Sequence, residues 1–530
     1  MKNVIRSLSI LFLLCILFQP VKAGALSYLK QDLKDTTLVT GFHTDSNRIE
    51  NFILYQRFTP AASNQIRQFY ESRDYQHAWV TEDGLSEHAQ IFLNLYDNYQ
   101  FYSADSTLRD PKLNAQIELL QSEGIKLDSI KSYGELELQL TDFFMRFIKR
   151  AYSGKVNPEN FQWHIPRKKI KIAEVMNTLV SSNDLTVDSW LPISKEFIAM
   201  RAQVIRLKSL DPENWIKITL MKGRVLRQGD TSKIIKTIKN RLMILGDLTT
   251  TDTTSLYDHN LVSAVESFQA RHGLTVDAII GPKSIETLNI PIEEKLKQML
   301  INMERMRWMP QHNESKRVEV NIPAFRMHVY QGIEDVLSMD VVVGKAATRT
   351  VIFSDQIKHV VFSPYWNLPM SIVKNEVVPG LERNKNYIAD HNMEIRGEQN
   401  GLPIVRQKPG PGNALGRVKF IFPNKYSIYL HDTPSRQLFK RTTRAFSHGC
   451  IRVEDPFAFA SNLLSPQKEW TSRKIKEAMH ENSEKWVNLD SPVPVYITYF
   501  TSWVDSSGKL NFRKDIYGHD RRLAEHLFTP

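Results

Sequence analysis

The spacing of apolar residues changes once along this chain, and the change limits the folds that it can adopt. In the first part they recur at helical spacing, most clearly over residues 138–148. From Val318 the period becomes two, and Phe325, Met327 and Val329 alternate with more polar side chains. A chain that is helical first and strand-rich afterwards predicts a multidomain α+β protein. Its 530 residues are also too many for one hydrophobic core.

The strand-rich part predicts a mostly-β domain, a sandwich or a partly closed barrel, because turns separate its short strands. Residues 368–405 lack the alternation and hold helical stretches, so we expect an inserted capping subdomain there. Asp455 and Pro456 predict a helix start, since Asp caps a helix and Pro fits its first turn. Further strands are expected at residues 336–343, 359–362, 426–431 and 495–500.

Residues 223–290 have a helical pattern of their own. The apolar faces of two predicted helices consist of Ile235, Ile238, Leu242 and Leu245, and of Leu261, Ala264, Val265 and Phe268. Gly281 and Pro282 open a short third helix that ends at Leu288. This pattern resembles the three-helix peptidoglycan-binding module. The resemblance implies binding to the cell wall, and a purely structural spacer is the alternative.

The chain is basic, with a net charge of +11 and a pI of about 9.3. This balance suits an anionic partner such as nucleic acid, anionic lipid or an acidic wall polymer. The one short basic cluster, residues 167–171, indicates a solvated face rather than a nucleic-acid patch. The charge therefore predicts an anionic partner, and the basic cluster does not single out nucleic acid.

Residues 1–23 have the features of a secretory signal peptide. Lys2 and Arg6 supply positive charge, and the apolar run over residues 8–18 is too short to span a bilayer comfortably. The small residues ahead of Gly24 predict cleavage there, with an uncleaved anchor as the alternative. We therefore expect export, which also argues against nucleic acid, and no later segment predicts a membrane span.

Cys450 is one of two cysteines, and the other, Cys15, lies inside the predicted signal segment. The mature chain is then expected to hold a single thiol without a disulfide partner, which indicates a reactive role. Cys450 follows Gly449 and His448, and His431 stands ahead of them. Acyl transfer by a thiol needs these elements: a thiolate, a proton carrier and donors for the developing oxyanion.

Cationic residues near Cys450 predict a thiol pKa below the free value of about 8.5. His431 and His448 compete for the role of base, and the N–H of Gly449 or of Cys450 is a candidate oxyanion donor. A zinc site is the other interpretation, but no Cys-x-x-Cys or His-Glu-x-x-His spacing is present, so no metal and no cofactor are predicted. The cations are Arg436, Lys440, Arg441, Arg444 and Arg452.

His431 followed by Ser447-His448-Gly449-Cys450 resembles the signature of the L,D-transpeptidase (YkuD-type) catalytic domain. The long form of that family has a scaffold domain, a peptidoglycan-binding module and a capped catalytic domain, in the order predicted here. The long form also implies the periplasm, within the cell envelope. Further stretches that agree are residues 320–325, 363–367, 409–417 and 430–434.

The resemblance implies that Cys450 attacks the carbonyl between the third and fourth residues of a stem tetrapeptide, expelling D-alanine and leaving a thioester. It implies that His431 carries the proton, that His448 lines the site, and that a second stem's diamino acid completes a 3→3 cross-link. The residue that orients His431 is left open. Candidate substrate-binding residues are Arg452, Ser447, Tyr365, Trp366 and Asn367.

Two other functions fit the same residues. An L,D-carboxypeptidase or another hydrolase would use the same thioester with water as acceptor. A wall-binding scaffold would have a catalytic domain that carries out no reaction. Peptidoglycan stem peptides are the expected partners, with other cell-wall enzymes as candidates. The predicted division is a signal peptide at 1–23, a helical scaffold domain at 24–222, the peptidoglycan-binding module at 223–290, a connecting helix at 291–316, a catalytic domain at 317–500 and a C-terminal extension at 501–530.

Overall fold

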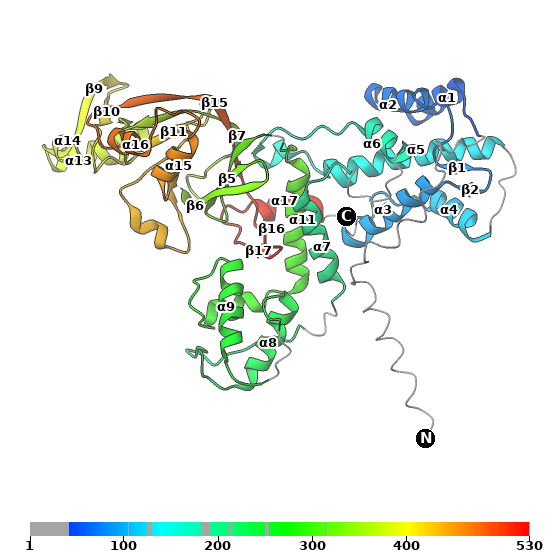
Figure 1. Ribbon diagram of the computed structural model, residues 1–530, viewed down its shortest axis with the longest axis horizontal. Helices are drawn as coiled ribbons and strands as arrows, with labels where there is room; N and C mark the ends of the chain where they lie inside the picture. Colours follow the sequence, from blue (N-terminus) through cyan, green and yellow to red (C-terminus); the bar gives the residue numbers. More distant parts are fainter. Residues whose placement is uncertain are drawn as a thin grey trace. The chain divides into compact units, whose positions relative to one another are not determined.

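The computed structural model describes residues 42–103, 105–123, 130–181, 191–210, 215–249, 254–312 and 314–528 (Figure 1). The predicted signal segment, residues 1–23, lies outside the described residues. Contacts divide the chain into two compact units, the first comprising described residues up to 90, 111–141 and 176–183, and the second the remainder.

The first unit is helical and is built around one buried carboxylate. Glu137, on helix α5 (Ile130–Ser153), accepts hydrogen bonds from the backbone N–H groups of Ala78 at 2.7 Å and Trp79 at 2.9 Å. The Trp79 indole donates to Thr141 Oγ1 at 2.9 Å. These bonds satisfy groups that burial would otherwise leave unpaired. Helices α1 (Ser46–Gln56) and α2 (Pro60–Glu71) belong to the same unit.

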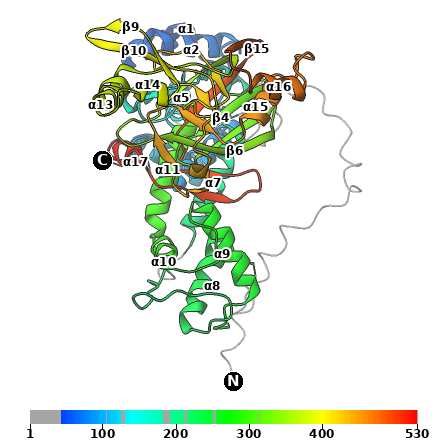
Figure 2. The same ribbon diagram turned by 90° about the vertical axis from the view of Figure 1, so that its left-hand side faces the viewer.

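Three helices of the second unit form the predicted module (Figure 2). They are α8 (Lys233–Leu245), α9 (His259–Arg271) and α10 (Pro282–Leu288). The apolar residues predicted for the faces of α8 and α9 are all buried in one cluster, which Leu226 and Ile280 complete. Asp258 caps α9 by accepting from Leu261 N–H at 2.9 Å. The three-helix prediction is confirmed.

A ten-stranded sheet forms the core of the second unit within the described residues. Nine strands follow the order β11-β12-β14-β6-β5-β4-β15-β7-β3, and the tenth, β13, pairs with β6 beside this path. Because β11 also pairs with β7, the sheet closes into a barrel-like structure. Val318, Val320, Met327 and Val329 all point into its core, as the period of two predicts. The strands are β3 (Trp163–His164), β4 (Lys316–Asn321), β5 (Arg326–Gln331), β6 (Glu334–Gly344), β7 (Ile352–Phe362), β11 (Val418–Ile421), β12 (Leu430–His431), β13 (Ala445–Ser447), β14 (Ile451–Val453) and β15 (Lys485–Thr498).

Two local features of this sheet differ from the sequence prediction. The strand expected over residues 426–431 is reduced to β12, because Asn424 and Ser427, with a φ of 55°, form a turn just before it. Strand β3 pairs in parallel with β7, although its residues fall in the predicted scaffold domain. Helix α15 (Pro456–Leu463) starts as predicted, with Asp455 capping the Ala458 N–H at 2.9 Å.

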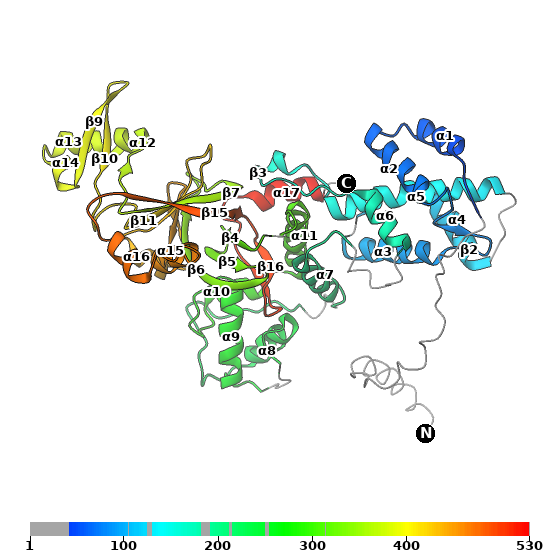
Figure 3. The same cartoon turned by 45° about the horizontal axis from the view of Figure 1, so that its top comes forward.

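The predicted capping insertion is a small subdomain with a core of its own (Figure 3). Strands β8 (Trp366–Asn367), β10 (Leu402–Gln407) and β9 (Met393–Gln399) form a separate sheet in that order. Leu368, Val373, Val377 and Val405 are buried between this sheet and the helical stretch. The helical stretch comprises α12 (Met370–Ile372), the π-helical turn η4 (Val373–Val377), α13 (Val378–Arg383) and α14 (Tyr387–Asp390).

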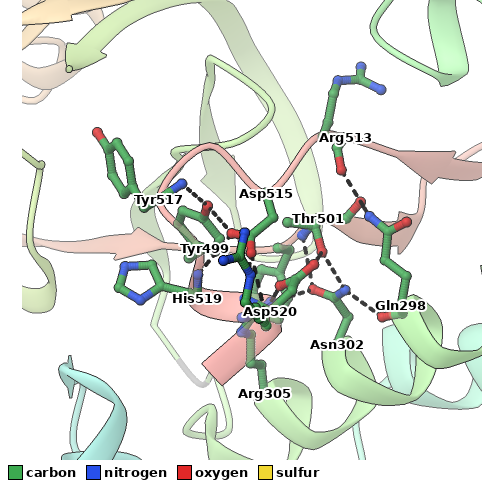
Figure 4. A network of polar contacts seen from close by, with 12 residues as sticks. Gln298, Asn302, Arg305, Tyr499, Thr501, Arg513, Asp515, Tyr517, His519 and Asp520 are labelled. Carbon is green, nitrogen blue, oxygen red and sulfur yellow. Dashed lines mark hydrogen bonds and ion pairs between the residues drawn. The ribbon is translucent and has the colours of Figure 1, made fainter. Parts of the chain in front are cut away.

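The end of the chain packs against helix α11 (Ile292–Trp308), which follows the three-helix module (Figure 4). Asn302 Nδ2 donates to Thr501 Oγ1 at 2.8 Å, and Arg305 pairs with Asp520 at 2.6 Å. The sequence predicts only an extension here. The segment forms strands β16 (Ser502–Val504) and β17 (Leu510–Phe512) and helix α17 (His519–Leu527).

Candidate active site

The site is built on two neighbouring strands of the closed sheet. Strands β12 and β14 pair in parallel, with Leu430 opposite Ile451 and His431 opposite Arg452. Leu430 and Ile451 are fully buried in the apolar core. Because successive side chains on a strand point to opposite faces, the alternate residues share the other face. The predicted nucleophile Cys450 comes directly before β14, next to these residues.

His431 is oriented by a backbone carbonyl. Its Nδ1 lies 2.5 Å from the Asp432 carbonyl oxygen, which can only accept, so the proton is on Nδ1 and Nε2 is free to accept one. Burial, with the positive charge of Arg452, lowers the pKa of His431 to about 3. The imidazole is therefore neutral at physiological pH. The Asp432 carboxylate instead accepts from Arg417 N–H at 2.8 Å.

The Cys450 thiol lies against the turn that precedes β12. Its Sγ donates to the Ser427 carbonyl at 3.6 Å. Burial raises the pKa of Cys450 above its ordinary value, although hydrogen bonds from Tyr429 and the charge of Arg452 act in the opposite direction. No hydrogen bond joins Cys450 to His431 in the described part of the chain. In the resting site, the thiol and the imidazole are therefore both neutral.

The predicted lowering of the thiol pKa is therefore wrong, mainly because burial raises the pKa and local sequence does not show that burial. Arg444 pairs with Asp340 of strand β6 at 2.9 Å, and Arg436 pairs with Asp432 at 3.2 Å. These carboxylates also compensate the positive charges of two arginines that were expected to lower the thiol pKa. Of the five predicted cations, Arg452 is the one whose charge lowers the pKa of Cys450.

We expect the rate of Cys450 alkylation by iodoacetamide to keep rising as the pH increases beyond 8.5, the free thiol value. The thiolate is the reactive form, and a raised pKa leaves less of it at neutral pH. Replacing Arg452 with Gln should move the profile to still higher pH. The measurement is the alkylation rate by mass spectrometry between pH 6 and 10. A plateau near neutral pH would instead indicate a thiolate–imidazolium pair.

The residues just before Cys450 hold the loop together. Ser447 is 2% exposed, and its hydroxyl donates to the Cys450 carbonyl at 2.6 Å and accepts from Gly449 N–H at 3.1 Å. Ser447 therefore shapes the loop, and its role in substrate binding stays a prediction. The Gly449 N–H is likewise committed, to Ser447 Oγ, whereas the other predicted oxyanion donor is the Cys450 N–H. Gly449 has a φ of 120°, which side chains rarely tolerate. His448 is exposed.

A pocket of about 260 Å³ shares two lining residues with the surroundings of the thiol, although neither Cys450 nor His431 lines it. Ser427 and Tyr429, which both contact Cys450, form part of its wall. The predicted residues Tyr365, Trp366 and Asn367 line it as well. Trp366 also packs against the core of the capping subdomain. The remaining lining residues are Leu415, Lys419, Ile421, Phe422, Pro423, Asn424 and Ile428.

Tyr429 is the site residue that sequence reasoning missed. Its hydroxyl interacts with Cys450, and burial is the main cause that raises its pKa, so it stays protonated and can donate to sulfur. Its ring centroid lies 5.6 Å from that of His431. The available signal was the spacing of two between Tyr429 and His431, which places both on one face of a strand.

Within the described ranges, no group of three or more His, Cys, Asp or Glu side chains could hold a metal ion. Across the same ranges, the helices are either too short or too polar to cross a membrane.

Three family models match successive parts of the chain. Residues 64–203 match the scaffold domain, residues 231–288 match the "putative peptidoglycan binding domain", and residues 315–495 match the L,D-transpeptidase catalytic domain (YkuD). The last range contains the pocket, His431 and Cys450.

A relative from Haemophilus influenzae, named "Putative L,D-transpeptidase", is 33% identical over 242 residues, covering 43% of this chain. The match spans 48% of that relative's own length. An L,D-transpeptidase structure from Xylanimonas cellulosilytica is 14% identical, with 53% of this chain and 100% of that one covered and a TM-score of 0.19. One from Mycobacterium smegmatis is 12% identical, with 36% and 61% covered and a TM-score of 0.20. TM-scores this low do not establish a common fold.

The domain models agree with the architecture in order and in kind. The three-helix module falls within its matched range, and the strand-rich, barrel-like sheet falls largely within residues 315–495. This chain is a multidomain protein with an L,D-transpeptidase (YkuD) catalytic domain, preceded by a scaffold domain and a peptidoglycan-binding domain.

Proposed function

We propose that this protein is an exported L,D-transpeptidase that forms 3→3 cross-links in peptidoglycan through a thioester on Cys450. The observation that carries the proposal is the grouping of Cys450 with neutral His431 and with Tyr429, which also lines the pocket. A thiol, a free imidazole acceptor and a pocket are what acyl transfer requires. The three-helix module would hold the enzyme on the same polymer.

In the first half-reaction, Cys450 Sγ attacks the carbonyl carbon between the third and fourth residues of a stem tetrapeptide. Its proton passes to His431 Nε2, which the Asp432 carbonyl leaves free by holding Nδ1. Collapse of the tetrahedral intermediate breaks the C–N bond, and the imidazolium returns the proton to the departing amine of D-alanine. A thioester remains on Cys450.

In the second half-reaction, the side-chain amine of another stem's diamino acid attacks the thioester carbonyl. His431 Nε2 takes a proton from that amine, the C–S bond breaks, and the proton passes to the thiolate. The product is a 3→3 amide bond, and both side chains return to their neutral resting forms.

Arg452 is suited to hold a carboxylate of the stem peptide. It shares the sheet face of Cys450, and its Nε is buried without a hydrogen-bond partner among the described residues. A carboxylate would satisfy that donor and offset the cost of burying the guanidinium. Tyr365 and Trp366 would bound the chain of the stem from the side of the capping subdomain.

The test is incubation of the purified chain from Gly24 onward with disaccharide-tetrapeptide, followed by mass spectrometry of the products. We expect free D-alanine and a cross-linked dimer that lacks one D-alanine. The matched control is the same protein after iodoacetamide treatment, which should release none. Tripeptide without dimer would contradict transpeptidation in favour of hydrolysis. No product, with retained sedimentation on purified wall, would leave the wall-binding scaffold as the function.

A further inference from the structure

A buried threonine holds the peptide bond between Gly449 and Cys450. Thr350 is 1% exposed, and its hydroxyl donates to the Gly449 carbonyl at 2.8 Å. The same oxygen accepts a hydrogen bond from Gly344 N–H at 2.9 Å. Because a hydroxyl has one proton, the Thr350 proton is committed to the Gly449 carbonyl. The direction of that carbonyl is therefore fixed from inside the protein.

The fixed carbonyl also sets the direction of the Cys450 N–H. The described residues contain no cis peptide bond, so the C=O and N–H across this bond point in opposite directions. With the Gly449 oxygen turned toward Thr350, the Cys450 N–H points away from it and has no acceptor in the described chain. The Gly449 N–H is used by Ser447 at 3.1 Å. The Cys450 N–H is thus the amide left for an oxyanion.

Thr350 is itself held by the C-terminal segment. Its N–H donates to the Tyr517 hydroxyl at 3.3 Å, and that hydroxyl donates to the Gly344 carbonyl at 2.5 Å. The Tyr517 N–H donates to the Tyr499 hydroxyl at 2.9 Å, which in turn donates to Asp515 at 2.6 Å (Figure 4). Tyr517 is 4% exposed, so little water competes for these bonds.

We propose that Thr350, held by Tyr517, is a positioning residue that aims the Cys450 N–H at the carbonyl oxygen of the substrate. The inference rests on the proposed function, because an oxyanion donor matters only if Cys450 attacks a carbonyl. It assigns a role in the reaction to the segment after residue 500, which lies outside the sequence motif around Cys450.

Two small reagents separate this role from a merely structural one. In the reaction with p-nitrophenyl acetate, Sγ attacks the ester carbonyl, an oxyanion forms, and p-nitrophenolate leaves as the C–O bond breaks. In the reaction with iodoacetamide, Sγ displaces iodide from a saturated carbon and no oxyanion forms. The measurement is the rate of each modification at Cys450, followed by intact-mass spectrometry at one pH, with Cys450→Ala as background. Neither reagent depends on peptidoglycan, so D-alanine release tests the proposed function separately.

Thr350→Val should lower the acetylation rate by about 10- to 100-fold, less than the ~10²–10³-fold cost of deleting an oxyanion donor. Its alkylation rate should stay within about threefold of wild type, because the thiol itself is unchanged. Thr350→Ser keeps the hydroxyl and should restore acetylation. Tyr517→Phe should lower acetylation in the same selective way, by a smaller factor.

Thr498→Val is the matched control. Thr498 is also buried, and its hydroxyl donates to the Val320 carbonyl at 3.2 Å away from the loop, so both rates should equal those of wild type. Acetylation of Thr350→Val at the wild-type rate would overturn the proposal, as would an equal fall in both rates. If Thr350→Val does not fold, the ratio of the two rates in Tyr517→Phe decides by the same criterion.

Discussion

Replacing Cys450 with alanine is expected to reduce D-alanine release from disaccharide-tetrapeptide by at least about 10⁴-fold. The variant loses the atom that forms the thioester, and Cys450 is the one free thiol among the described residues. The pocket and the backbone donors remain, but they cannot replace the covalent step. The measurement is D-alanine release over time together with intact-mass detection of the acyl-enzyme, which should be absent.

The loss should not come from unfolding. Alanine removes only Sγ, with its long hydrogen bond to the Ser427 carbonyl at 3.6 Å and the bonds that it accepts from Tyr429, so the thermal midpoint should change little. Sedimentation with purified wall should also match that of wild type, because the three-helix module is untouched. Retained D-alanine release would show that another group is the nucleophile and would remove the basis for the proposed reaction.

Replacing His431 with glutamine is expected to lower kcat for D-alanine release by about 10²- to 10⁴-fold. The imidazole Nε2 is the group placed to accept the thiol proton, since Nδ1 is committed to the Asp432 carbonyl. Gln can hold a hydrogen bond but cannot carry a proton between the two half-reactions. Steady-state kinetics measure kcat, and alkylation by iodoacetamide checks that the thiol stays accessible.

His448 supplies the matched comparison, because it is the other histidine that the sequence offered as a base. It is exposed, whereas His431 is 4% exposed and lies on the strand beside Cys450. His448→Gln should therefore retain kcat within about an order of magnitude, below the range for loss of a general base. A larger loss in His448→Gln than in His431→Gln would reverse the assignment of the base.

Much of the fold could be predicted because its signals are local. The buried faces of α8 and α9 follow from a period of 3.6, and β4 and β5 follow from a period of two. The start of α15 follows from Asp455 and Pro456, whose preferences depend only on the adjacent backbone. These residues need no knowledge of the rest of the chain.

Other features could not be predicted because they depend on pairing between distant residues. Strand β3 is recognisable only through its pairing with β7, and the pairing of Arg444 with Asp340 joins the residue before β13 to strand β6. The prediction for the thiol pKa is wrong mainly because the thiol is buried, which depends on such pairing as well. Thr350 and Tyr517 carry no local signal either, since their role depends on contacts with Gly344 and Gly449. Such pairings, ion pairs and hydrogen bonds are set by tertiary packing rather than by local preference.

The position of β15 in the sheet has a consequence for the order of events during synthesis. Residues 485–498 pair with β4 on one side and with β7 on the other, so they fill the middle of the sheet rather than its edge. A ribosome makes Cys450 before it makes this strand, and the sheet cannot close until the strand arrives. The thiol and its histidine therefore enter a finished barrel only when nearly the whole chain is available.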